Sequence, residues 1–216
     1  MSQTEPLSRL SLSRQIRNRL LGRIMSGELK PGDRLVELKI ANEMATSQAP
    51  VREAIRELEA MGVIVTLRNK GARVRVITDE ELRQIYDVRA QLEGYAAQLV
   101  TTSGIAIKDM LMNNILQMKK AARESNSQAF SDHNMEFHRT IVKNSNNAIL
   151  LDMWETLNVK TRTMINVSRS RKNLLELANS HVRLVEAIVS GDAELALEVA
   201  RNHVLDNKPD DLALQA

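Results

Sequence analysis

The apolar residues of this 216-residue chain follow a helical period along most of its length and change to strand-like alternation in one short stretch. From Ser11 to Ser26 they recur every four residues, as expected of an amphipathic helix. After Gly62 the period becomes two, and no such alternation is found beyond Val76. The sequence therefore predicts a mainly α protein with one small β element.

Charge and aromatic content divide the chain at Ile77. The first 77 residues carry 14 Lys and Arg against 8 Asp and Glu, whereas the remainder carries 16 against 19. All five aromatic residues and all four histidines lie in the second part. We expect a basic domain over 9–76 and a mildly acidic one over 78–207. The ends, 1–8 and 208–216, are expected to be flexible.

A cationic domain suggests a polyanionic partner such as nucleic acid, because binding phosphates releases counterions, although an excess of this size also occurs on ordinary surfaces. The absence of cysteine excludes disulfides, thiolate metal sites and thiol nucleophiles. No apolar run approaches the roughly 18 residues of a membrane span, and the first ten residues lack the apolar core of a signal peptide. We therefore expect a soluble cytoplasmic protein with no membrane partner.

Three helices are predicted before the alternating stretch. The first spans about 11–26, and turn-forming residues follow at 30–33. A second helix fits Val36–Met44, and Ser47 can cap a third. Because about three residues join the second and third helices, their spacing is typical of a helix-turn-helix.

The third helix is predicted to have two faces. Its apolar stripe consists of Val51, Ala54, Ile55, Leu58 and Met61. The residues that point elsewhere are Gln48, Ala49, Arg52, Glu53 and Arg56, so the N-terminal half can face a groove. Two arginines on a helix are, taken alone, more often a solvated face than a binding site.

The alternating stretch predicts a β-hairpin. Val63, Val65 and Leu67 are predicted to alternate outward before the turn at 68–71, and two valines with arginines between them follow it. The tip and one face would be basic. Helix, helix-turn-helix and hairpin make a winged helix, and two elements that converge on one basic surface favour DNA binding.

Beyond Ile77 the sequence predicts only helices. Thr78-Asp79-Glu80-Glu81 has the pattern of a capping box, in which the threonine accepts a hydrogen bond from the third following amide. A helix starts there, and others are predicted at about 105–123, 127–144, 147–166, 171–190 and 192–207. Together they form an all-α six-helix bundle.

Three histidines fall where such a bundle could bring them together. His181 and His203 flank a predicted turn at similar distances, so an antiparallel helix pair would bring them level. His138 shares a helix face with Asn134, four residues earlier. Three imidazoles can hold a metal, but a helical histidine is more often just polar or partly buried, and His133 is interpreted that way.

Several N-terminal segments carry a family resemblance: Lys30–Leu35, Pro50–Leu58, Gly62 and Asn69–Gly71. In order and spacing they resemble the DNA-binding domain of GntR-family bacterial transcription regulators. The resemblance implies that the recognition helix enters the major groove and that the wing tip approaches the minor groove.

On this basis the DNA-binding residues are Ser47, Gln48, Ala49 and Arg52 at the helix start, with Lys70 and Gly71 at the wing. The family usually has arginine at position 48. Arginine binds guanine through two hydrogen bonds, whereas a glutamine such as Gln48 suits adenine. The operator is therefore expected to differ from the family's usual pattern.

In the second domain the matching segments are Tyr86–Glu93, Phe137–Arg139, Asn144–Asn147 and stretches between His181 and His203. They resemble the helical FCD effector domain of the FadR subfamily of that family, and six helices are closer to its VanR-like branch. The resemblance implies a divalent metal, often Zn²⁺, held by one aspartate and three histidines beside a site for small carboxylates.

The three histidines match His138, His181 and His203, whereas the aspartate is replaced by Asn134. A neutral amide oxygen is a weaker ligand, so metal affinity and metal choice are open. Arg89 has two interpretations. It could form a salt bridge to Asp87, Glu93 or a neighbouring helix, or, by resemblance, pair with an effector carboxylate.

Three functions remain open from the sequence. The first is a homodimeric transcription regulator, a repressor by family habit, that binds a pseudo-palindromic DNA operator and a small carboxylate effector. The second is a metal-dependent hydrolase, although Glu136, the nearby candidate base, points off the His138 face. The third is an architectural DNA-binding protein whose helical domain only dimerises.

Overall fold

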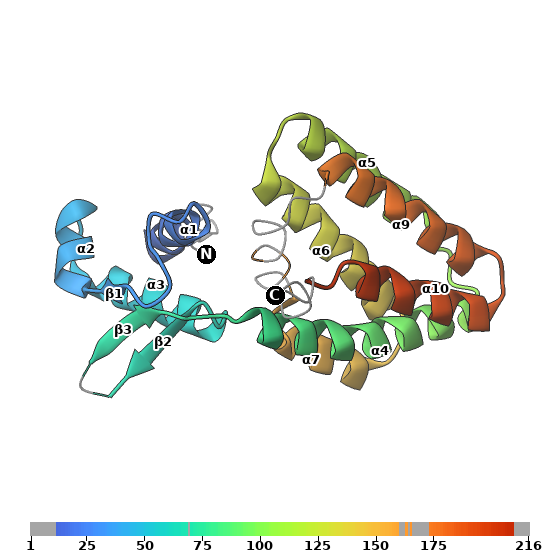
Figure 1. The fold of residues 1–216 in the computed structure, drawn as a ribbon, viewed down its shortest axis with the longest axis horizontal. Coiled ribbons are helices and arrows are strands. Elements are labelled where there is room, and N and C mark those ends of the chain that lie inside the picture. Colours follow the sequence, from blue (N-terminus) through green and yellow to red (C-terminus); the bar gives the residue numbers. More distant parts are fainter. Residues whose placement is uncertain (1–11, 69, 160–162, 164, 166–172, 210–216) are drawn as a thin grey trace, which may run out of the picture. The chain divides into compact units, whose positions relative to one another are not determined.

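The computed structural model describes residues 12–68, 70–159, 163, 165 and 173–209, and Figure 1 shows their fold. Contacts within the chain divide it into two compact units, Met1–Val76 and Ile77–Ala216. The predicted flexible segment at 1–8 and residues 210–216 of the other lie outside the described residues. None of the described helices is long and apolar enough to cross a membrane.

The first unit is a winged helix, as predicted. The chain forms α1 (Leu12–Met25), β1 (Arg34–Leu35), α2 (Glu37–Glu43), α3 (Gln48–Ala60), β2 (Ile64–Leu67) and β3 (Gly71–Val74). The strands are antiparallel in the order β1-β3-β2, with Arg34 opposite Arg73 and Ile64 opposite Val74. β1 was not expected, because two residues are too short to show a period.

The core of the first unit lies between α1, α3 and the sheet. Ile16 and Leu20 of α1 are buried, as are the predicted α3 positions Val51 and Leu58. Burying each such aliphatic side chain contributes about 1.5 to 3 kcal/mol. This packing leaves the polar side of α3 exposed.

One local prediction in this unit holds in part and another needs correction. Val65 and Leu67 face outward as predicted, with exposures of 36% and 40%, whereas Val63 is buried and Ile64 faces the core opposite Val74. Ser47 occupies the position that precedes α3, but its side chain makes no capping hydrogen bond. The hydroxyl of Ser47 therefore lies exposed at the start of α3 and does not cap the helix.

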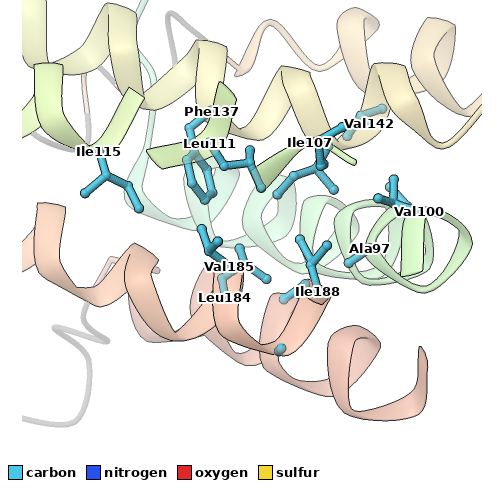
Figure 2. Close-up of a cluster of buried hydrophobic side chains, with 14 of the residues drawn as sticks. Ala97, Val100, Ile107, Leu111, Ile115, Phe137, Val142, Leu184, Val185 and Ile188 are labelled. Atoms are coloured by element: carbon cyan, nitrogen blue, oxygen red, sulfur yellow. The ribbon is translucent and has the colours of Figure 1, made fainter. Parts of the chain in front are cut away.

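The second unit is all helical in its described residues. It contains α4 (Asp79–Ser103), α5 (Lys108–Arg123), α6 (Ser127–Asn144), α7 (Ala148–Thr156), α9 (Leu174–Val189) and α10 (Ala193–Asp206). α10 packs along α4, and α5 packs against α6 and α9. The core of this unit consists mainly of aliphatic side chains packed around Phe137, including Leu111, Leu184 and Val185 (Figure 2).

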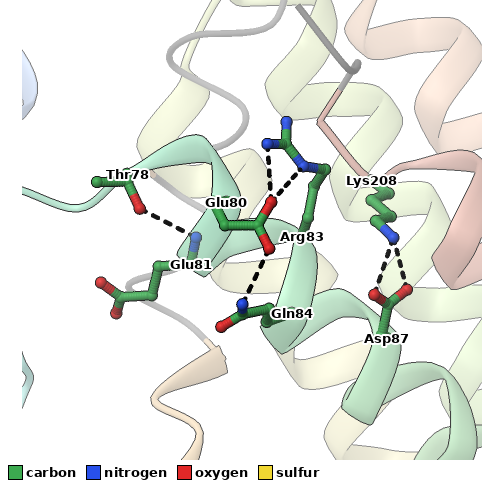
Figure 3. A network of polar contacts seen from close by, with 7 residues as sticks. All are labelled: Thr78, Glu80, Glu81, Arg83, Gln84, Asp87 and Lys208. Carbon is green, nitrogen blue, oxygen red and sulfur yellow. Dashed lines mark hydrogen bonds and ion pairs between the residues drawn. The ribbon is translucent and has the colours of Figure 1, made fainter. Parts of the chain in front are cut away.

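The predicted cap at the start of α4 is confirmed. Thr78 Oγ1 accepts a hydrogen bond of 3.1 Å from the amide of Glu81 (Figure 3). At the other end of the chain, the ammonium of Lys208 donates to both carboxylate oxygens of Asp87, at 2.7 and 2.9 Å. This contact fastens the residues after α10 to α4.

The helix predicted over 147–166 is interrupted. α7 ends at Thr156, and Asn158 has a φ of 51°, in the left-handed region that an α-helix does not contain. Helical geometry resumes at Val159 and is also seen at Thr163 and Ile165. The interruption has a local cause, because asparagine tolerates the left-handed conformation that ends a helix. Residues 160–162, 164 and 166–172, where two predicted helices extend, lie outside the described residues.

Candidate functional site

The residues predicted to contact DNA lie at the start of α3 and at the wing. Ser47, Gln48 and Ala49 are all exposed. Lys70 is exposed at the β2–β3 turn, and Gly71 has a φ of 76°, a conformation that side chains disfavour. The helix start and the wing therefore each present predicted DNA-binding residues to solvent.

Arg52 is exposed but already engaged. Its Nε and Nη2 donate to Oε2 of Glu37 at 3.0 and 2.8 Å. The hydrogen bond and the charge of Glu37 raise the pKa of Arg52. Because Glu37 lies in the first turn of α2, this ion pair joins the two helices of the helix-turn-helix and limits the directions in which Arg52 can point. No sequence pattern predicted this ion pair.

The three predicted imidazoles meet inside the second unit. His138 comes from α6, His181 from α9 and His203 from α10, and each is at most 8% exposed. The ring centroids of His181 and His203 are 4.3 Å apart, and His138 lies 5.3 and 5.4 Å from them. One nitrogen from each ring lies within 4.8 Å of the others, so small ring movements can bring all three to one ion.

The protonation of His181 suits a metal ligand. Its Nδ1 lies 2.8 Å from the carbonyl oxygen of Leu177, one turn earlier in α9, and must carry the proton to donate there. Nε2 then carries a lone pair, and it has no hydrogen-bond partner among the described residues although it is buried. A buried nitrogen lone pair without a partner costs free energy, and a bound cation would satisfy it. The residues present therefore fit a metal ion.

Burial keeps His181 and His203 neutral. It lowers the pKa of His203 to about 3, with a further contribution from His138. It also lowers the pKa of His181 well below the usual value, assisted by His203 and His138. Phe137 packs edge-on against His181 with the centroids 4.7 Å apart, which excludes water from that side. Neutral imidazoles are the form that binds metal.

Glu93 of α4 is a buried carboxylate beside this cluster. Its Oε1 accepts hydrogen bonds from Arg89 Nε at 2.9 Å and from Trp154 Nε1 at 2.7 Å. Its Oε2 lies 2.8 Å from Nδ1 of His138. Burial alone would raise the pKa of Glu93, but the charge of Arg89, together with the contacts of His138 and Trp154, outweighs it and holds that pKa below its usual range. Glu93 is therefore ionised in the folded protein.

In this structure Arg89 forms a salt bridge with Glu93, one of the two roles predicted for it. The guanidinium is 2% exposed, donates from Nη1 to Thr163 Oγ1 at 3.2 Å and lies 4.8 Å from the centre of the Tyr86 ring. Its charge is balanced by Glu93. Burial lowers the pKa of Arg89, but Glu93 and Tyr86 outweigh that effect and the net shift is upward.

From the sequence, Glu93 was predicted only as a possible salt-bridge partner of Arg89. A signal was available, because Arg89 and Glu93 lie four residues apart between the buried positions Leu82, Tyr86 and Ala96, which places both on the inward face of α4.

The remaining predicted residues occupy different positions. Asn134 is buried one turn before His138 on α6, where a fourth ligand was expected. His133 is partly exposed and does not belong to the cluster formed by the other histidines. A pocket of about 420 Å³ opens between α9 and α10, and its lining includes Arg183, Asn202 and His203. The histidine cluster therefore has one member that also lines a pocket.

The sequence matches two family profiles. Residues 12–74 match "Bacterial regulatory proteins, gntR family", and residues 84–206 match "FCD domain". Together the two matches span most of the described residues of both units.

Individual proteins give the same result. The chain is 32% identical to the "Probable D-xylose utilization operon transcriptional repressor" of Paenarthrobacter nicotinovorans, over 92% of this chain and 88% of that protein. It is 30% identical to the "Gluconate operon transcriptional repressor" of Bacillus licheniformis, over 89% and 82%. Among solved structures, E. coli McbR/YncC superposes with a TM-score of 0.70 at 24% identity, over 92% of this chain and 96% of that one, which shows a shared fold.

Proposed function

We propose that this chain, which belongs to the GntR family of bacterial regulatory proteins and carries an FCD domain, is a repressor that a small carboxylic acid releases from its operator. It is a DNA-binding transcription regulator modulated by a small-molecule effector, and not an enzyme. The repressor assignment is supported by the names of the two relatives. Its site of action would be DNA in the cytoplasm.

The DNA-reading surface would be the exposed start of α3. Gln48 and Arg52 lie one helical turn apart there, so both can reach base edges or phosphates when the helix lies in the major groove. Lys70 and Gly71 would approach the neighbouring minor groove from the wing. Since Arg52 is paired with Glu37, we propose that Glu37 holds the arginine in the direction needed for docking.

The metal-binding residues would be His138, His181 and His203, with Asn134 as a weaker fourth ligand. A set of three imidazoles and one amide favours Zn²⁺ among the common divalent ions, because imidazole is a preferred zinc ligand. The ion, when bound, would supply a positive charge that can attract a carboxylate. His203 also lines the pocket between α9 and α10, whose volume of about 420 Å³ suits a small metabolite.

Arg89 would supply the second positive charge for the effector. A guanidinium binds a carboxylate through paired, charge-assisted hydrogen bonds, and Arg89 is held within the same buried network as the histidines through Glu93. An effector carboxylate would therefore have to compete with Glu93 for Arg89. This competition would change contacts of α4, the helix that begins directly after the first unit.

A homodimer on a pseudo-palindromic operator is the arrangement we propose for DNA binding, because a two-fold dimer presents two recognition helices one DNA turn apart. The effector would act by having different affinities for the DNA-competent and DNA-incompetent arrangements of the dimer. A purely architectural role is disfavoured, since it gives no reason for three buried imidazoles beside an arginine–glutamate pair.

The observation that carries this proposal is the buried histidine cluster joined through Glu93 to Arg89, in a chain that also presents a winged helix. The experiment is a gel shift on the DNA upstream of the gene for this chain, with Zn²⁺ present and a panel of small carboxylic acids added. We expect at least one acid to weaken binding by about tenfold or more, which corresponds to a typical allosteric coupling.

The Arg89→Lys variant should lose that response while it still binds the DNA, because lysine keeps the charge but lacks the planar fork. Arg83→Lys, on the same helix but paired with Glu80 at the surface, is the matched control and should respond as the wild type does. An Arg89→Lys protein with an unchanged response would contradict the assigned role of Arg89.

A further inference from the structure

Glu93 occupies a position between the two parts of the proposed effector site. One carboxylate oxygen receives hydrogen bonds from Arg89 and Trp154, and the other lies 2.8 Å from the Nδ1 atom of His138. All four side chains are at most 4% exposed. The two oxygens of Glu93 therefore contact different partners: Oε1 contacts Arg89 and Trp154, and Oε2 contacts His138.

The contact with His138 fixes which ring nitrogen carries a proton. A carboxylate oxygen and an unprotonated imidazole nitrogen would repel each other through their lone pairs at 2.8 Å, so Nδ1 must bear the hydrogen. In a neutral ring the other nitrogen, Nε2, is then left with the lone pair that a metal needs. No described residue donates a well-aligned hydrogen bond to Glu93 Oε2, so the 2.8 Å contact with His138 Nδ1 is short but not ideally directed, and no other donor in the described part of the chain competes for this oxygen.

The same pattern recurs at His181 with a different partner. There the Nδ1 proton is directed to the carbonyl of Leu177, and Nε2 is left without a partner among the described residues. As neutral rings, the two imidazoles on different helices would share the same tautomer, with Nδ1 directed to a carboxylate in one case and to a backbone carbonyl in the other.

We propose that Glu93 is a positioning residue for metal binding: its Oε2 holds His138 in the Nδ1-protonated tautomer, while its Oε1 is fixed by Arg89 and Trp154. This inference rests on the proposed metal site. Partners of this kind typically change metal affinity by about 10- to 100-fold when they are removed. Glu93 also makes the position of His138 depend on Arg89, since both contact the same carboxylate.

Glu93→Gln tests this proposal without removing side-chain volume. The amide oxygen of the glutamine should stay on the side of Arg89 and Trp154, because both are donors and the amide nitrogen is not an acceptor. The amide NH₂ then faces His138 and donates to Nδ1, so the imidazole proton moves to Nε2. His138 would lose the lone pair that binds the metal.

The control is Glu155→Gln on α7. Glu155 pairs with Arg139 at the surface, so this variant makes the same chemical change in the same unit without a contact to the histidines. Trp154 is the chain's single tryptophan, and its fluorescence reports whether each variant is folded.

Two measurements are made on the full-length protein. ¹⁵N chemical shifts of the imidazoles in metal-free protein should show His138 protonated on Nδ1 in the wild type and in Glu155→Gln, but on Nε2 in Glu93→Gln. Competition with a chromophoric chelator should show Zn²⁺ affinity about 10- to 100-fold weaker for Glu93→Gln than for the other two.

The outcomes separate this inference from the proposed function. If the wild type binds no Zn²⁺, the proposed metal site fails, while the tautomer measurement still tests the contact with Glu93. If the wild type binds Zn²⁺ and folded Glu93→Gln keeps the same tautomer or the same affinity, the positioning role of Glu93 is overturned and the metal site stands.

Discussion

The ring centroids of His181 and His203 lie 4.3 Å apart, on α9 and α10, the two helices that the turn at Ser190–Asp192 connects. His138 joins them from α6. Two protonated imidazoles at this spacing would repel each other in a buried site, so the cluster favours neutral rings or a bound cation. Its behaviour should therefore depend on both pH and metal.

The metal-free protein should lose stability as the pH falls from about 6.5 towards 3. Burial lowers the pKa of His203 to about 3 in the folded chain, whereas an ordinary histidine titrates near pH 6.5. Within this window the unfolded chain binds a proton that the folded chain does not, so stabilisation present above about pH 6.5 is progressively lost below it. The contribution of this histidine is about 1.4 kcal/mol of unfolding free energy per pH unit.

Urea denaturation followed by the fluorescence of Trp154 measures this loss at several pH values. His203→Gln should reduce the slope of stability against pH. His133→Gln, which alters a partly exposed histidine outside the cluster, should leave the slope unchanged. A metal-free wild type that is equally stable above and below this window would show that the ring of His203 is not held neutral by burial.

Arg52→Ala should weaken operator binding by about tenfold or more at fixed salt, because it removes a cation at the start of the recognition helix. Arg17→Ala is the matched control. Arg17 also forms a cross-helix ion pair, with Glu57, but it comes from α1, so its loss removes the same charge away from the proposed reading surface. Equal effects of the two substitutions in a gel shift would argue against the docking of α3.

Gln48→Arg should change which base is preferred at one operator position. Glutamine makes its paired hydrogen bonds with adenine, whereas arginine makes them with guanine. Selection of binding sites from a randomised DNA pool should show a switch from adenine to guanine at that position, with the other positions unchanged. An identical preference in both proteins would mean that residue 48 does not read a base.

Much of this architecture follows from side-chain periodicity. The stripe that contains Val51 and Leu58 predicted the buried face of α3, and the pattern after Thr78 predicted the cap of α4. The level placement of His181 and His203 followed from their spacing around one turn, because helical rise converts residue number into length. These features depend on contacts that are local or that a single turn determines.

The features that escaped prediction depend on contacts between distant segments or on one backbone angle. β1 exists because Arg34 and Leu35 pair with β3, and a two-residue strand has no period of its own. Glu93 is a buried anion because Trp154, 61 residues later, and His138 converge on it. The break after α7 depends on the left-handed conformation of Asn158.

The zinc content of the purified protein tests the central claim most directly. After exposure to Zn²⁺ and removal of excess metal, elemental analysis should find stoichiometric zinc in the wild type and in His133→Ala, and none in the double variant His138→Ala with His203→Ala. Circular dichroism should show that all three proteins remain helical. A folded double variant that retains stoichiometric zinc would contradict the assignment of these histidines as the metal ligands.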